Sequence, residues 1–112
     1  MKKEERKEVD KSWGGEIWLV NNIYCGKLLV VEKNKECSYH YHKNKQETFI
    51  CLEGHALLTI EGKEYDLNPM ATGKTIFPGE YHKFKGLDKT LILEVSTHHE
   101  DEDTYRMGVN PL

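Results

Sequence analysis

The chain lacks long apolar segments and a surplus of positive charge, and each absence excludes a class of protein. No apolar run approaches the roughly 20 residues of a membrane-spanning helix, and the first residues do not resemble a secretory signal. The formal net charge is −3, from 16 Lys and Arg against 19 Asp and Glu, whereas nucleic-acid-binding proteins usually present a basic face. We therefore expect a cytoplasmic protein with no membrane partner and no nucleic-acid partner.

Cysteine is also scarce. Cys25, Cys37 and Cys51 are odd in number and form no Cys-x-x-Cys motif. Together with the missing secretory signal, this pattern favours reduced thiols over disulfides. Cys51 lies in an apolar run and is interpreted as a small core residue. Cys37 precedes a pair of histidines and could approach their site, but a structural role is the favoured interpretation.

Helical periodicity is absent beyond the first eleven residues, and short β-branched and aromatic runs alternate with turn residues instead. The expected strands are 16–20, 27–32, 37–42, 48–53, 56–60, 63–67, 75–77, 82–85 and 91–96. A chain of 112 residues, 38% hydrophobic and 31% charged, is expected to form one globular domain. Strands this short and frequent predict an all-β sandwich or barrel whose strands close or double over, as in a jelly roll.

Both ends of the chain are strongly charged. We expect residues 1–12 to form a short charged N-terminal arm, helical or frayed, and residues 13–112 to form a single barrel with a C-terminal tail. Glu94 interrupts the apolar run of the last strand, and strand alternation predicts that it faces outward. The acidic tail with His98 and His99 is interpreted as a solvated segment rather than a second metal site.

Four residues carry most of the functional information. His40 and His42 are two apart, so on a strand both imidazoles point to the same face, whereas on a helix they would diverge. Glu47 follows after a short turn, and His82 comes after the Pro-Gly turn at 78–79. Imidazole and carboxylate groups are ligands of divalent transition metals. If the four side chains converge, they would hold a metal ion inside the barrel.

The pattern resembles the cupin superfamily. Its first motif, His-x-His, three or four residues, Glu, six residues, Gly, is matched by His40, His42, Glu47 and Gly54. Its second motif, Gly, Pro-x-Gly, two residues, His, is matched, with Pro and Gly adjacent, by Gly73, Pro78, Gly79 and His82. The resemblance covers residues 13–96 and implies a cupin-type double-stranded β-helix, that is, a jelly-roll barrel. It also implies one divalent ion (Mn, Fe, Zn, Ni or Co) held by His40, His42, Glu47 and His82.

Lys45 lies between the motif residues and gives the order His-x-His-x-x-Lys-x-Glu. This arrangement is similar to the D-lyxose isomerase branch of the sugar-isomerase cupins, and the stretch from Glu94 to Arg106 is similar to the cupin part of mannose-6-phosphate isomerases. The resemblance implies a sugar ligand and an aldose–ketose isomerisation through a metal-stabilised enediolate. Lys45 and Glu47 are then the candidate catalytic residues that move the proton. The alternative for Lys45 is a solvated loop lysine.

Two alternative functions stay open at the level of sequence. The barrel could be a non-catalytic module that binds a sugar or a small acid, or an iron-dependent dioxygenase, because the same ligands bind iron. The resemblance also implies a homodimer. Tyr39, Tyr41 and Tyr81 are expected on the outer face, where their rings would suit an interface between two barrels.

Overall fold

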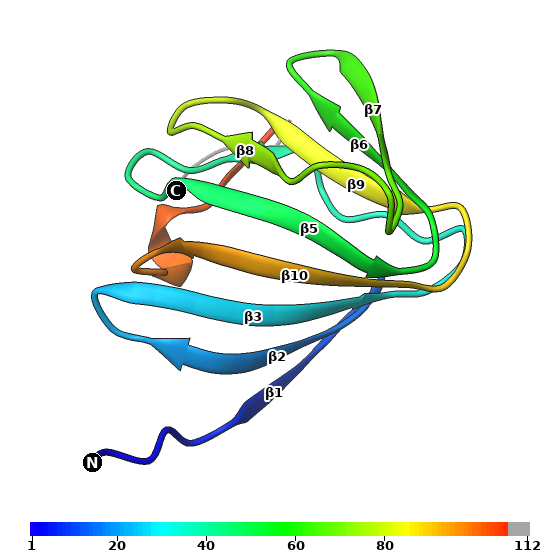
Figure 1. Cartoon of the computed structure of the whole chain (residues 1–112). Helices are drawn as coiled ribbons and strands as arrows, with labels where there is room; N and C mark the ends of the chain where they lie inside the picture. Colours follow the sequence, from blue (N-terminus) through cyan, green and yellow to red (C-terminus); the bar gives the residue numbers. More distant parts are fainter. Residues whose placement is uncertain (108–112) are drawn as a thin grey trace.

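The computed structural model describes residues 1–107, whose regular secondary structure is almost entirely antiparallel β-strand (Figure 1). The strands of this part are β1 (Lys7–Lys11), β2 (Gly14–Asn21), β3 (Tyr24–Val31), β4 (His40–Tyr41), β5 (Glu47–Glu53), β6 (Ala56–Ile60), β7 (Lys63–Leu67), β8 (Lys74–Ile76), β9 (His82–Gly86), β10 (Thr90–Thr97) and β11 (Tyr105–Arg106). One short 3-10 turn, η1 (Asp101–Asp103), precedes β11. None of the helical segments described is long and apolar enough to cross a membrane.

The strands form two sheets that enclose the interior of the barrel (Figure 1). One sheet has the order β1-β2-β3-β10-β5-β8, and the other has the order β11-β4-β9-β6-β7. The late strand β10 lies between the early strands β3 and β5, so the chain doubles back into its own first half. The predicted all-β architecture is confirmed.

The inward-facing side chains change from apolar to polar along each of the three central strands. On β3 the buried row runs from Val31 and Leu29 to Lys27, and on β10 it runs from Ile92 to Glu94. On β5 the buried row runs from Phe49 to Glu47, the first residue of the strand. One end of the barrel is therefore a hydrophobic core, and the other end is a cavity lined by ionisable groups.

Gly54 closes the turn between β5 and β6 at a position that requires glycine. Its φ is +88°, and a Cβ there would lie 2.2 Å from the carbonyl oxygen of Lys89. Any other residue would combine left-handed backbone strain with a clash against main chain. The glycine at this place in the histidine motif therefore has a steric cause that is separate from metal binding.

The N-terminal residues form a strand, so the expectation of a helical arm is wrong for this part. Residues Lys7–Lys11 pair as β1 with the free edge of β2, and Val9 lies opposite Glu16. The open edge of β2 offers backbone hydrogen bonds to this segment, and such pairing outweighs weak helix propensity. Residues 108–112, the end of the predicted tail, lie outside the described residues.

Candidate metal centre and cavity

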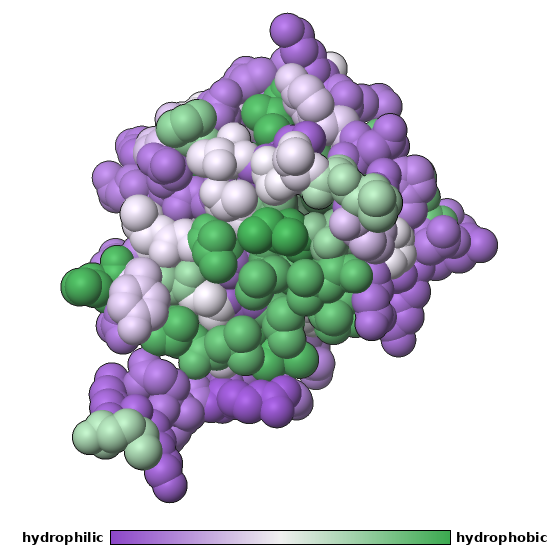
Figure 2. Space-filling model, viewed as in Figure 1, coloured by the Kyte–Doolittle hydropathy of each residue, from purple (hydrophilic) through white to green (hydrophobic). Residues whose placement is uncertain are grey.

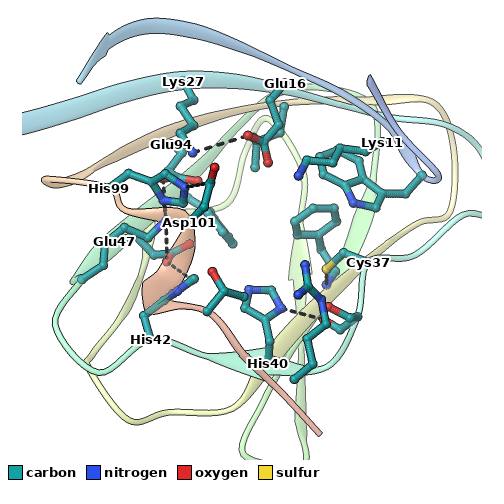
Figure 3. A pocket seen from close by; sticks show the side chains of 18 of the residues that line it. Lys11, Glu16, Lys27, Cys37, His40, His42, Glu47, Glu94, His99 and Asp101 are labelled. Carbon is teal, nitrogen blue, oxygen red and sulfur yellow. Dashed lines mark hydrogen bonds and ion pairs between the residues drawn. The ribbon is translucent and has the colours of Figure 1, made fainter. Parts of the chain in front are cut away.

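Three histidines converge at the polar end of the barrel. His40 lies in β4 opposite His82, the first residue of β9, and His42 follows β4 directly. The nearest ring nitrogens of the three lie within 4.8 Å of one another. His42 and His82 are buried and His40 is half-buried. Figure 3 shows His40 and His42 pointing into the cavity. This cluster could hold a metal ion.

Backbone carbonyls fix the tautomer of each ring. The Nδ1 atoms of His40, His42 and His82 lie 2.7, 2.9 and 2.9 Å from the carbonyl oxygens of Ser38, Asp103 and Glu80. A carbonyl only accepts, so each Nδ1 carries a proton, and Nε2 is the nitrogen that each ring can offer to a metal. Burial, and then the neighbouring His82, lower the pKa of His40 to about 3, which keeps this ring neutral near pH 7.

Glu47 completes the group from β5. Its Oε2 lies 3.0 Å from His42 Nε2, and its Oε1 lies 3.8 Å from His82 Nε2. Glu47 Oε2 and His82 Nε2 are also buried without a hydrogen-bond donor. Unpaired buried atoms of this kind cost about 1–3 kcal/mol each, and a cation between them would satisfy both.

The charge of Glu47 also fits a cation. Burial alone would raise the pKa of this carboxyl, but His42, Lys45 and His82 outweigh burial and hold its pKa below the usual value. Glu47 is therefore ionised, and the group offers three imidazoles and one carboxylate. This set suits Mn, Fe, Zn, Ni or Co, so the residues present fit the metal that the sequence motif implies.

Lys45 points inward, so the alternative of a solvated loop lysine is wrong. The residue is 4% exposed. Its Nζ lies 2.9 Å from His99 Nδ1, 3.2 Å from Glu94 Oε2 and 3.5 Å from Glu47 Oε2. Burial opposes the charge, but Glu94 and then Glu47 outweigh burial and raise the pKa of Lys45. Lys45 is thus a buried cation between two carboxylates.

Glu94 also faces the cavity, and the prediction that it faces outward is wrong. The strand alternates as expected, but its inward row contains Thr90, Ile92 and Glu94 while its leucines face outward. The prediction assumed that apolar residues point inward, and this assumption fails where the barrel interior becomes polar. Burial first, and then the charge of Glu47, raise the pKa of Glu94.

The C-terminal segment closes one side of the cavity, and sequence reasoning missed this role. His99 is buried, accepts from Lys45 through Nδ1 and donates through Nε2 to Asp101 Oδ1 at 2.8 Å. Asn21 binds the backbone of His99 through two hydrogen bonds of 2.9 Å. Burial, and then the charges of Lys45 and Lys27, lower the pKa of His99 to about 4. A histidine inside an acidic run gave no signal of such a contact.

Sequence reasoning also missed Lys27, a fully buried cation in β3. Its Nζ lies 3.4 Å from Glu16 Oε1 and 4.1 Å from the centre of the Trp18 ring. Burial opposes the charge of Glu16, but Lys27, the Trp18 indole and Lys11 lower its pKa. Figure 3 shows Lys27 and Glu16 on the opposite side of the cavity from His40. A lysine in an apolar run was the only sequence signal.

The cavity has a volume of about 370 Å³, and its walls differ in character. Its polar lining includes His40, His42, Lys45, Glu47 and Glu94. Trp13, Phe49 and Phe84 also line it, and the Trp13 and Phe84 rings meet edge to face at 4.9 Å. A cavity of this size and mixed character fits a small polar molecule that has some C–H surface.

Asp103 fixes the loop between His42 and Glu47. Its carboxylate accepts the backbone N–H groups of Lys43, Asn44 and Lys45 at 2.8, 3.1 and 3.1 Å, and its carbonyl orients His42. The carboxylate and the carbonyl together hold Lys45 and His42 in place.

Replacing Asp103 with Ala should lower the free energy of unfolding by about 1–3 kcal/mol, because three N–H groups lose a charged acceptor. It should also weaken metal binding roughly tenfold to a hundredfold through the ligand loop. Urea unfolding and metal titration measure the two effects. The neighbouring change Glu102→Ala, at an exposed position, is the control. Equal stability of the two variants would contradict this role.

Comparisons with known proteins agree with the fold. The family model for the cupin domain matches residues 27–90. A D-lyxose/D-mannose isomerase of Thermosediminibacter oceani is 29% identical over 114 residues, and the match covers 77% of this chain and 62% of that protein. The chain thus spans less than two thirds of the length of this curated relative.

Two solved structures show the same fold at low sequence identity. The capsular polysaccharide assembling protein CapF from Staphylococcus aureus has a TM-score of 0.82 at 14% identity, covering 95% of this chain and 32% of that chain. KdgF from a Halomonas species has a TM-score of 0.76 at 12% identity, covering 88% and 90%. Because the family model matches more than half of the sequence, this chain belongs to the cupin family.

Proposed function

We propose that this cupin binds one divalent metal ion through His40, His42, Glu47 and His82 and isomerises a small carbohydrate-type molecule between aldose and ketose forms. The observation that carries the reaction is the buried pair of Lys45 and Glu94 beside the three-histidine cluster. Such a pair is an acid and a base in the same cavity. The similarity to the isomerase of Thermosediminibacter oceani supports the substrate class.

A divalent ion bound at this site would polarise a carbonyl oxygen as a Lewis acid. The protein then has to move a proton between two adjacent carbons and another between their oxygens. Glu94 and Glu47 both lie within reach of Lys45. Glu94 is the stronger base, because its pKa is raised while that of Glu47 is lowered. We therefore assign proton removal from carbon to Glu94 and metal binding to Glu47.

Lys45 is proposed to serve the substrate oxygen. Its ammonium lies between both carboxylates and donates to His99, so it can stabilise negative charge that develops on a hydroxyl or carbonyl oxygen. His99 in turn binds Asp101, which is exposed. This chain of hydrogen bonds gives protons a route between the cavity and solvent.

The protein loaded with Mn(II), Fe(II), Zn(II), Ni(II) or Co(II) should convert at least one aldose in a panel of pentoses and hexoses into its ketose. Proton transfer through Glu94 further predicts that the product formed in D2O carries deuterium at the carbon beside the carbonyl. NMR of the product measures both. Protein treated with a chelator is the control. Absence of any conversion with all five ions would refute the isomerase assignment.

The cavity supports one other function, because its volume of about 370 Å³ and its mixed lining fit a small polar molecule that need not react. The barrel could then bind a sugar or a small acid without converting it. Calorimetry distinguishes the two functions: saturable binding of a sugar to the metal-loaded protein, without product, would favour the binding module.

A further inference from the structure

The strands of the six-stranded sheet carry charged residues on their inner side. Glu16 of β2 pairs with Leu29 of β3, and Lys27, two residues before Leu29, pairs with Glu94 of β10. Directly opposed residues share one face, and Leu29 belongs to the buried core, so these charged side chains point inward. Figure 2 shows the outer side of the same strands as a largely hydrophobic area. The metal centre and Lys45 account for Glu94 but not for Glu16 and Lys27.

The carboxylate of Glu16 is held through one oxygen only. The Trp18 indole donates to Oε1 at 2.8 Å, and Lys27 Nζ lies 3.4 Å from the same oxygen. No donor within residues 1–107 contacts Oε2. The side chain lines the cavity and is 15% exposed. Oε2 is therefore an acceptor that a molecule in the cavity can reach.

The neighbours of Glu16 fix its position and its charge. The ammonium of the buried Lys27 lies 4.1 Å from the centre of the Trp18 ring, and that ring meets His99 edge to face at 5.1 Å. Burial raises the pKa of Glu16, but Lys27, the Trp18 indole and Lys11 outweigh burial and lower it. An ionised and already oriented carboxylate accepts a hydrogen bond from a ligand with little loss of side-chain entropy.

Glu16 lies across the cavity from the histidines. Figure 3 shows it on the side opposite His40. Its strand β2 is separated from β5, which carries Glu47, by β3 and β10. Three strand spacings of about 4.8 Å place the backbones of β2 and β5 at most about 14 Å apart. With a volume of about 370 Å³, the cavity fits one monosaccharide that has one end at the metal centre and the other end near Glu16.

We propose that Glu16 is a specificity-determining residue whose Oε2 accepts hydrogen bonds from hydroxyl groups at the end of the sugar that is remote from the metal. A carboxylate oxygen only accepts, so its match is a donor group, and the donors of a neutral sugar are hydroxyls. Trp18 and Lys27 are positioning residues that act through Glu16. The inference rests on the proposed function for the substrate class but not for the reaction.

Calorimetry of the full chain loaded with Zn(II) tests the proposal with D-mannose and its 4-deoxy and 6-deoxy analogues. D-mannose is chosen because the similar isomerase of Thermosediminibacter oceani is named for it. The wild-type protein should bind at least one analogue about tenfold to a hundredfold more weakly than D-mannose, because a hydrogen bond to a charged group is lost. In Glu16→Gln, whose amide oxygen is an uncharged acceptor, this difference should narrow to roughly threefold.

Two further variants separate a contact from a structural effect. Trp18→Phe keeps an aromatic ring beside Lys27 but removes the N–H that orients Glu16, so it should narrow the same difference in part. Glu8→Gln is the matched control, because Glu8 is exposed and pairs with Ile17 on the outer side of the sheet. A purely structural Glu16 would weaken the binding of all three sugars by the same factor. Far-UV circular dichroism confirms that each variant is folded, and Trp18→Phe decides if Glu16→Gln does not fold.

The outcomes that overturn the proposal differ from those that overturn the reaction. Equal binding of D-mannose and both analogues by the wild-type protein refutes the role of Glu16, and so does a difference that persists unchanged in Glu16→Gln. Failure of all three sugars to bind at millimolar concentration refutes it as well. A protein that shows the expected differences but forms no ketose keeps this subsite and loses the isomerase assignment. A protein that converts D-mannose without these differences keeps the reaction and loses the subsite.

Discussion

Adding Mn(II) or Zn(II) to protein that has been stripped of metal should raise the melting temperature by roughly 15–30 °C. A ligand present at about 1,000 times its Kd stabilises the folded state by about 4 kcal/mol. One kcal/mol shifts the melting temperature of a domain of about 100 residues by roughly 4–8 °C. The structural reason is that Glu47 Oε2 and His82 Nε2 are buried without a hydrogen-bond partner, and a bound cation would satisfy both atoms.

His40→Ala tests whether this stabilisation comes from the three-histidine cluster. The variant removes one Nε2 from the site, so it should lose most of the rise in melting temperature and should bind less metal in elemental analysis. His55→Ala is the matched control, because His55 lies on the surface and pairs with Asp66 at 2.8 Å. An equal rise in both variants would mean that the metal stabilises the protein from another place.

The two-residue period of strands is the part of the fold that the sequence predicts best. It places His40 and His42 on one side of a strand, and the structure brings them together with His82. The expected strands 56–60 and 63–67 agree with β6 and β7 at both ends. Turn residues bound these strands sharply, and the turn at Gly62 has the positive φ that favours glycine.

The partners of the site residues could not be predicted, because they depend on contacts between distant parts of the chain. Asp103 binds the loop that starts 60 residues earlier, and His99 reaches Lys45 across 54 residues. Neither contact follows from local pattern, since the acidic tail has the composition of a solvated segment. Strand β1 was missed for the same reason: it forms only because β2 offers an open edge.

Strand β10 shows why the direction of its side chains was predicted wrongly. Its sequence alternates, but Glu94 lies in the cavity while Leu91, Leu93 and Val95 lie on the outer side of the sheet. The prediction took the apolar row as the inner one. The physical cause of the error is a barrel whose interior is polar at one end.

The buried pair of Lys45 and Glu94 gives the sharpest test of the site. Lys45→Met should lower the free energy of unfolding by about 3–5 kcal/mol, because it leaves a buried carboxyl without its cation. The double variant Lys45→Met with Glu94→Leu should recover most of this loss, since removing both charges removes the uncompensated group. Urea unfolding of the two single variants and the double variant measures the coupling.

Activity separates a structural pair from a catalytic pair. Glu94→Gln keeps the shape and a hydrogen-bond acceptor for Lys45 but cannot take up a proton, so kcat should fall by about 10²–10⁴ while the fold is retained. The stable double variant should be inactive for the same reason. If the double variant is as stable as the wild type and still isomerises a sugar, the pair is structural and proton transfer must be assigned to Glu47. If Lys45→Met alone causes no loss of stability, the two groups do not interact as their 3.2 Å contact indicates.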